Sequence, residues 1–182
     1  MASSEIYPIL GATDPVANTP KYTQDLKAAL AVPRAVRGVS TGTITLGTST
    51  TMAPLPTDVR TAGLVMEDVP YVGTTGGDLE CLLTFGGWDV KHAGAGDIRL
   101  GAQILDPFGN VDVGTGVVGV DWLRQTAASN SMSRTRTVLI PQPTIFNGIQ
   151  AQLMYAISGS PTTKTVSYAF VELTPLRWRY PS

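Results

Sequence analysis

From about Val39 onward, apolar and polar residues alternate with a period of two, and this alternation constrains the fold more than any other feature. The clearest case is 149–158, where the odd-numbered positions from Ile149 to Ile157 are apolar and glutamines occupy two of the positions between them. Because successive side chains of a β-strand point to opposite faces of its sheet, such a segment buries one face. Nowhere do these segments alternate with helical patterns, as a parallel α/β sheet requires. The sequence therefore predicts an all-β antiparallel fold.

Glycine and proline divide the alternating region into short strands. The chain contains 19 glycines and 13 prolines, which favour strands and turns over helices. Pro70 places one strand at an edge or a bend, the segment 79–90 breaks at Gly86-Gly87, and 164–173 is apolar on both faces. We expect a jelly-roll β-sandwich over residues 38–182. Its strands, about eight in number, are predicted at 38–46, 62–73, 79–90, 97–105, 111–122, 134–140, 149–158 and 164–173.

The stretch GNVDVGTGVVGVDW contains a G-x-G-x-x-G pattern from Gly114 to Gly119. This pattern holds the phosphates of a nucleotide only where it joins a strand to a helix, whose N-terminal amides contact the phosphates. Here the flanking residues are β-branched, and the chain continues from Val120 to Trp122 with no helical pattern. A shift of the alternation near Gly116 is typical of a β-bulge. We therefore expect a bent strand and no cofactor.

The first 37 residues differ from the rest and are predicted to form an N-terminal docking arm, residues 1–37. A short helix is expected at about 20–31, with Thr19 as its N-cap, Pro20 at its first position and Pro33 closing the segment. The helix could pack on its own domain or be held by another protein, and we favour the second alternative. The expected contact residues of the arm are Ile6, Tyr7, Ile9, Leu10, Tyr22, Leu26 and Leu30.

The charge balance excludes two classes of partner. Only 15% of the residues are charged, and the formal net charge is −1. Such a chain has no basic footprint for nucleic acid or for an anionic membrane surface. No apolar run approaches the roughly 20 residues that span a bilayer. We expect neither nucleic-acid binding nor membrane insertion, and a weakly charged surface favours association with other proteins.

Residues that could carry catalysis or hold a metal are scattered. Cys81, the single cysteine, lies in an alternating segment and is expected to be a small buried hydrophobe. The single histidine, His92, lies in a glycine-rich turn, KHAGAGD. Asp106, Asn110 and Asp112 fit a β-turn better than a calcium loop. We expect no enzyme activity and no metal site, although acids that converge across strands for glycan hydrolysis remain an alternative of lower rank.

The C-terminal tail, LTPLRWRYPS, concentrates aromatic and basic residues. Trp, Tyr and Arg are the residue types that dominate the energetics of protein interfaces. We therefore predict a second interface at Arg177, Trp178, Arg179 and Tyr180. In the alternative, Trp178 covers the bottom of the sandwich. Trp88 and Trp122 are either core residues or platforms on which sugars stack.

Two stretches resemble the jelly-roll domains of virion proteins from tailed bacteriophages. The earlier one, similar to a hairpin of those domains, is GGDLECLLTFGGWDVKHAGAGDIRLGAQILDPFGN. The later one, similar to their last strand pair, is NGIQAQLMYAISGSPTTKTVSYAFVELTPLRW. The resemblance covers roughly residues 60–180. It implies a trimeric, non-catalytic virion component, such as a minor tail protein, a fibre or a capsid decoration protein, that docks through its N-terminal arm.

We therefore expect a non-enzymatic structural protein of the virion, assembled in the host cytoplasm and attached to head or tail by its arm. Its expected partners are further copies of itself in a homotrimer and other virion proteins. The alternative is a carbohydrate-binding module for the host surface, which would expose an aromatic groove.

Overall fold

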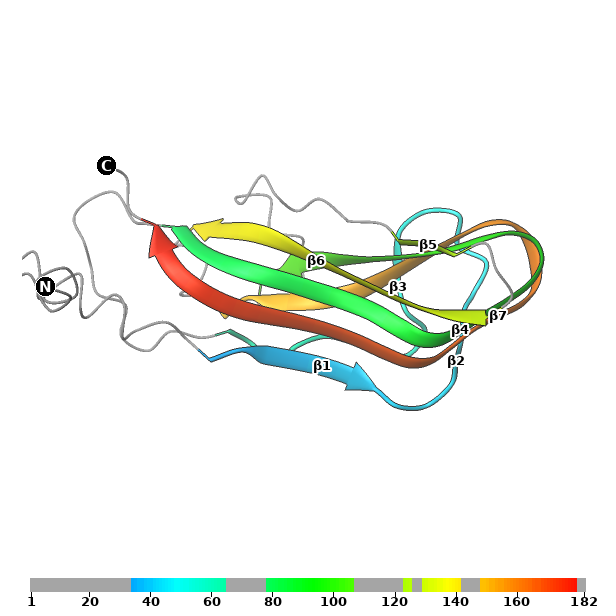
Figure 1. Ribbon diagram of the computed structural model, residues 1–182, viewed down its shortest axis with the longest axis horizontal. Coiled ribbons are helices and arrows are strands. Elements are labelled where there is room, and N and C mark those ends of the chain that lie inside the picture. The colour runs from blue at the N-terminus through cyan, green and yellow to red at the C-terminus, as the bar shows by residue number, and fades with distance from the viewer. Residues whose placement is uncertain (1–33, 65–77, 107–122, 126–128, 142–147, 180–182) are drawn as a thin grey trace, which may run out of the picture.

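The computed structural model describes residues 34–64, 78–106, 123–125, 129–141 and 148–179, and this part of the chain is all-β (Figure 1). It contains no helix, and every pairing between its strands is antiparallel. The predicted all-β antiparallel class is therefore confirmed. Its strands are β1 (Val36–Ser40), β2 (Ile44–Thr45), β3 (Ala53–Pro54), β4 (Asp78–Leu105), β5 (Leu123–Gln125), β6 (Ser129–Pro141) and β7 (Gln150–Arg179).

The two long strands, β4 and β7, form the centre of one sheet and pair along their whole lengths. β1, β2 and β3 pair with β7 on its other edge, while β5 and β6 pair with the outer edge of β4. Beyond β3 the chain stays on β7, and the amide of Leu64 donates a hydrogen bond of 2.7 Å to the carbonyl oxygen of Ile149. The segment 36–64 therefore follows β7 from one end to the other.

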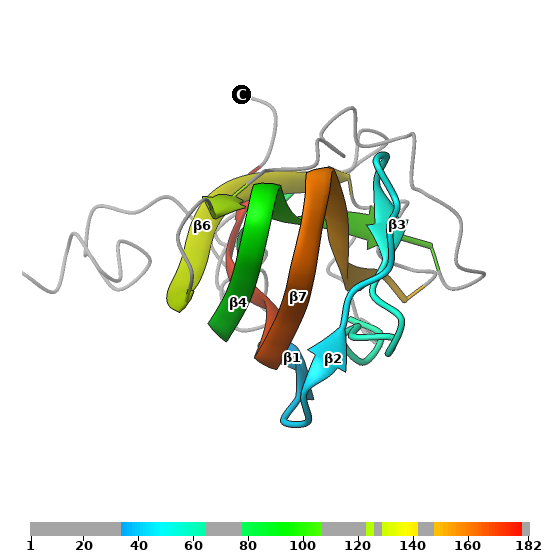
Figure 2. The ribbon, with the colours of Figure 1, turned by 90° about the vertical axis from the view of Figure 1, so that its right-hand side faces the viewer.

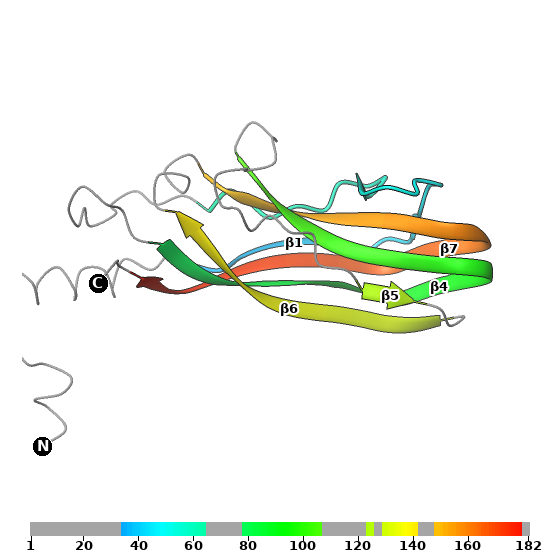
Figure 3. The same ribbon diagram turned by 90° about the horizontal axis from the view of Figure 1, so that it is seen from above.

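Both long strands bend at the same place, and the sheet curls back over itself (Figures 1 and 3). At the bend Gly96 is paired with Gly159, and Gly94 lies two residues before Gly96. The φ angles of Gly94, Gly96 and Gly159 are 92°, 130° and 73°. Glycine adopts this region readily because it has no Cβ, so the glycine-rich sequence at the bend has a direct conformational reason.

The bend divides the sheet into two halves, which Figure 2 shows from the bent end. The β1 half contains β1, β2, β6 and the paired segments 78–93 and 163–179, and the β3 half contains β3, β5 and the paired segments 96–105 and 150–158. The halves approach closely at Gly87. A Cβ added there would lie 2.6 Å from a methyl carbon of Val166 in the same half and 3.4 Å from one of Leu100 in the other.

One hydrophobic core lies between the halves, and alternation along the strands fills it as predicted. In β4 the residues Leu79, Cys81, Leu83 and Phe85 are buried on one side of the bend. The other half of β4 contributes Ile98, Leu100, Ala102 and Ile104. Ile149, just before β7, also belongs to the core, and β7 contributes Ala151, Leu153, Tyr155, Ile157, Val166, Ala169, Val171 and Leu173. The segment that follows the edge of β7 adds Ile44, Leu46, Leu55, Val59 and Leu64.

In two cases, two strands that were predicted as separate form one continuous strand in the structure. The segments 79–90 and 97–105 both belong to β4. The segment 164–173 and all of 149–158 except Ile149 belong to β7. The turn expected around His92 is therefore part of the β4–β7 ladder, and glycine bends the strand there without ending it. β1 begins at Val36, two residues before the expected start of the β-domain.

Two local details also differ from expectation. Gly86-Gly87 does not interrupt β4, and the shift in its pairing with β6 falls between Gly87 and Val90. In β7 the face opposite Ile149 is covered as well, since Gln152 and Met154 are only 3% and 4% exposed.

Several predictions fall on residues outside the described part of the chain. They are the arm residues 1–33 with the helix at 20–31, most of the strand at 62–73, the strand at 111–122 with Trp122 and the pattern from Gly114 to Gly119, and Tyr180.

Candidate functional site

A cluster of aromatic side chains lies on the outer face of the β1 half, and we call it the aromatic patch. It consists of Trp88 from β4, Tyr168 and Phe170 from β7, and Arg37 and Val39 from β1. The register places Trp88 opposite Tyr168 and Val39 opposite Phe170. Directly opposite residues of an antiparallel pair project from the same face, so three strands contribute to one surface.

The three rings support one another. Trp88 is stacked on Tyr168 with ring centroids 4.6 Å apart and planes inclined by 18°. Phe170 meets Trp88 edge-on at 6.5 Å and lies 6.1 Å from Tyr168. These separations lie in the range in which aromatic pairs attract beyond the effect of burial. Phe170 is consequently only 8% exposed, whereas Trp88 remains 52% exposed.

Arg37 fixes the edge of the patch. Its guanidinium carbon lies 5.4 Å from the centroid of the Phe170 ring, within the range of a cation–π contact. The same guanidinium donates a hydrogen bond of 3.1 Å to the hydroxyl oxygen of Tyr168 and lies 3.7 Å from the Glu172 carboxylate. Arg37 therefore holds the rings of Tyr168 and Phe170 in position.

A β-bulge at Asp89 explains why Trp88 and Val90, two positions apart in β4, face opposite sides of the sheet. Asp89 has a φ of 49°, a conformation that aspartate tolerates better than most residues. Relative to β6 it adds one residue to β4, so that Trp88 points outward while Val90, two positions later, is fully buried. The Asp89 carboxylate accepts a hydrogen bond from Ser167 at 2.9 Å and pairs with Lys91 at 3.2 Å, which hold the bulge in place.

The patch has the chemistry of a binding surface. Trp, Tyr and Arg are the residue types that carry most of the energy in protein interfaces, and exposed rings also stack on the apolar faces of sugars. Around the rings, the positive charges of Arg37 and Lys91 are matched by the negative charges of Glu172 and Asp89. The surface is therefore apolar at its centre and electrically balanced at its rim.

Sequence reasoning identified Trp88 as a candidate platform but missed Tyr168, Phe170 and Arg37. A signal for the first two was present, because 164–173 is apolar on both faces. In the structure Tyr168 and Phe170, on the outer face of that strand, both contact Trp88 and Arg37 of the same chain.

The predicted C-terminal interface is described only in part. The guanidinium of Arg177 donates a hydrogen bond of 2.7 Å to Glu80, whose side chain is only 10% exposed. Arg177 therefore neutralises a buried carboxylate of its own chain, while its side chain remains 67% exposed. Leu176 beside it is 44% exposed. The side chains of Trp178 and Arg179 lie outside the described part.

Cys81 and His92 are both buried, and they do not meet. His92 follows Cys81 by eleven positions of extended strand, roughly 35 Å along β4. Burial, helped by the neighbouring charge of Glu80, raises the pKa of the Cys81 thiol to about 12. The expectation that Cys81 is a small buried hydrophobe is confirmed. Among the described residues there is also no group of three acidic, histidine or cysteine side chains that could hold a metal ion.

We expect the Cys81 thiol to be unreactive in the folded protein. Because its pKa rises from 9.0 to about 12, the thiolate fraction at pH 8 falls about a thousandfold relative to the unfolded chain. Iodoacetamide labelling, followed by mass spectrometry with and without urea, measures this difference. Equal labelling rates in the two states would contradict the burial of Cys81.

The same shift predicts a loss of stability at alkaline pH. Because the pKa of the Cys81 thiol is higher in the folded state than in the unfolded state, this group stabilises the folded protein below pH 9. This contribution to the free energy of unfolding is lost as the pH rises toward 12. We expect the free energy of unfolding to fall more steeply above pH 9 in the wild type than in Cys81→Ala. Urea unfolding at pH 8 and pH 10.5, followed by circular dichroism, compares the two proteins.

No protein-family model matches the chain, and a search of curated proteins finds no relative. In the part of the chain that the structure describes, no helix is long and apolar enough to span a membrane.

Proposed function

We propose that the curled sheet is a jelly-roll sandwich and that the protein is a non-enzymatic structural component of a tailed-phage virion. The strand order supports the first part. With the bend included, one half has the order β1–β7–β4–β6, and the other has segment 53–64, then β7, β4 and β5. A jelly roll has this arrangement, in which each long strand of a wrapped pair contributes to both sheets. This strand order is the observation that carries the proposal, together with the resemblance of the sequence to virion proteins.

In this proposal the protein forms a homotrimer, and the aromatic patch of one copy contacts the neighbouring copy. The exposed half of Trp88 is the anchor, and the balanced charges of Arg37, Lys91, Asp89 and Glu172 let two like-charged chains approach without net repulsion. A ring of three copies closes through one repeated contact of this kind. The N-terminal arm then attaches the trimer to head or tail, and the trimer needs no cofactor.

Replacing Trp88 with alanine tests the role of the patch. Loss of a central aromatic anchor is expected to raise the dissociation constant of the trimer roughly 30-fold or more. The fold is expected to persist, because Trp88 is half-exposed and lies outside the core cluster. Multi-angle light scattering over a dilution series measures the effect, and Thr57→Ala, at an exposed position of the other half, is the control. A wild-type protein that stays monomeric at every concentration would overturn the homotrimer.

Carbohydrate binding is a second candidate function, because the exposed Trp88 ring is backed by the stacked ring of Tyr168. Such a rigid platform suits the apolar face of a sugar. A glycan array separates the two functions. Saturable binding that Trp88→Ala abolishes, with the wild type monomeric, would favour the host-surface module over the scaffold.

A further inference from the structure

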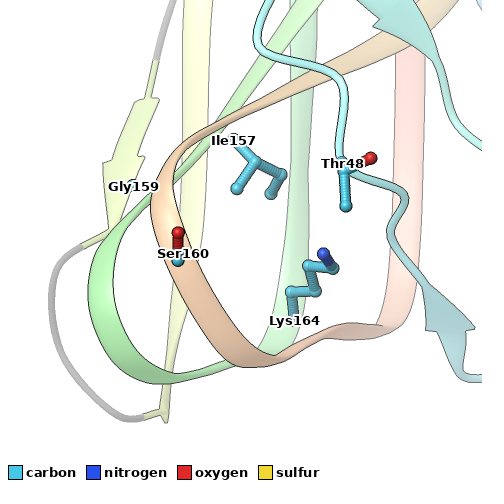
Figure 4. Close-up of a pocket in the computed structure, with 5 residues that line it drawn as sticks. All are labelled: Thr48, Ile157, Gly159, Ser160 and Lys164. Carbon is cyan, nitrogen blue, oxygen red and sulfur yellow. The ribbon is translucent and has the colours of Figure 1, made fainter.

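A recess lies on the inner side of the bend, away from the aromatic patch. It has a volume of about 290 Å³ and is lined by Thr48, Ile157, Gly159, Ser160 and Lys164. Figure 4 shows the Lys164 side chain extending along the recess toward Ile157 and Thr48, with Ser160 across from it. The volume is close to the lower limit for small-molecule sites, so the recess fits a single small group.

The lining combines one cation, two hydroxyl groups and one apolar wall. Lys164 is half-buried and carries the charge, while Thr48 and Ser160 are exposed and can rotate their hydroxyl hydrogens toward a ligand. Ile157 is only 3% exposed and forms the wall. An ammonium beside hydroxyl donors is suited to an acceptor that carries negative charge.

The charge of Lys164 is not neutralised within the described part of the chain. The two carboxylates on the neighbouring strand near the bend have other cations: Asp89 pairs with Lys91 at 3.2 Å, and Asp97 lies 3.6 Å from Arg99. No described carboxylate lies within ion-pair distance of Lys164, and none lines the recess. His92, directly opposite Lys164 in the ladder, is 4% exposed and does not line the recess. Among the described residues that line the recess, Lys164 is therefore the one that carries a charge.

We propose that this recess binds a small oxyanion, a carboxylate or a phosphate group, with Lys164 as its counter-ion and Ser160 and Thr48 as hydrogen-bond donors. The site goes beyond the proposed function and does not depend on the oligomeric state. The oxyanion could be free phosphate or the carboxylate of an acidic sugar, whose apolar ring face would lie against Ile157. The ammonium group recognises both, and the experiment separates them.

The chain offers a matched control in Lys91. It lies next to the rung formed by His92 and Lys164, but it pairs with Asp89 and is exposed outside the recess. Lys91→Gln and Lys164→Gln therefore remove the same charge from neighbouring rungs of the ladder, but from opposite faces of the sheet. Only the second variant removes it from the recess.

The experiment titrates the full-length, ¹⁵N-labelled protein with sodium phosphate and with sodium glucuronate, against sodium chloride at the same ionic strength. We expect saturable shifts of the Thr48, Gly159, Ser160 and Lys164 amide signals with at least one oxyanion. Lys164→Gln is expected to weaken this binding about tenfold or more, Lys91→Gln to leave it unchanged, and Lys164→Arg to retain most of it. Saturation by glucuronate alone identifies the acidic sugar, and saturation by phosphate identifies the phosphate group.

Three results would overturn the site. They are equal shifts with chloride, equal weakening by Lys91→Gln and Lys164→Gln, and the absence of saturation with both oxyanions. Thermal unfolding of the three variants verifies that each is folded before its binding is compared. A protein that binds the oxyanion as a monomer would support this site while contradicting the homotrimer.

Discussion

Replacing Gly96 with alanine is expected to lower the free energy of unfolding by about 2–6 kcal/mol, combining backbone strain with steric overlap. Gly96 has a φ of 130°, which side-chain-bearing residues rarely adopt. A Cβ at this position would also overlap the carbonyl oxygen of Ser158 on the neighbouring strand. Because that atom belongs to the backbone of β7, rotation of a side chain cannot relieve the overlap. Urea unfolding monitored by tryptophan fluorescence measures the change.

Gly42→Ala is the matched control for this substitution. Nothing lies within 4 Å of a Cβ added at Gly42, and the residue is exposed. Its effect is expected to stay within about 0.5 kcal/mol. Insoluble Gly96→Ala protein beside soluble Gly42→Ala protein would be the extreme form of the expected result. Equal stability of the two variants would show that β4 and β7 do not make this bend.

The core could be predicted from the sequence because its signal is local. Leu79, Cys81, Leu83 and Phe85 alternate along one strand, and the positions between them face away. Burial of one face follows from the period of two, whatever strand lies beside it. The all-β class and the burial of Cys81 both depend on this local pattern, and both are confirmed.

The continuity of the long strands could not be predicted in this way. A run such as KHAGAGD indicates a turn between two strands as well as it indicates a bend within one. The difference depends on whether the partner strand bends at the same point, and here Gly96 faces Gly159 from a distant part of the chain. The two glycines can be matched only when the register of β4 and β7 is known.

The composition of the aromatic patch could not be predicted from the sequence either, because it also depends on which strands lie side by side. Trp88 and Phe170 are each visible as apolar residues on the outer side of a strand, but their proximity depends on long-range register. The bulge at Asp89 adds a further difficulty. Aspartate is a weaker sequence signal for a left-handed conformation than glycine, so the return of Val90 to the core two residues after the outward-facing Trp88 has no clear sequence signal.

Removal of residues 1–33 is expected to leave the sheet folded and to abolish attachment of the protein to virion particles, if the proposed function holds. Folding should survive because β1 begins at Val36 and the buried core cluster extends from Ile44 to Leu173. Attachment should fail because each large apolar anchor that is lost removes about 1.5–3 kcal/mol of burial energy. In a trimer the loss is repeated in three linked arms, so avidity disappears together with affinity.

Co-sedimentation with particles that lack the protein measures attachment, and circular dichroism with thermal unfolding verifies the fold. A milder variant, in which Tyr22, Leu26 and Leu30 are replaced by serine in the full-length chain, is the matched test of the anchors themselves. It should lose attachment while retaining the wild-type melting temperature. Unchanged attachment of the truncated protein would mean that the arm is not the anchor, and an unfolded truncated protein would mean that residues 1–33 belong to the folded domain.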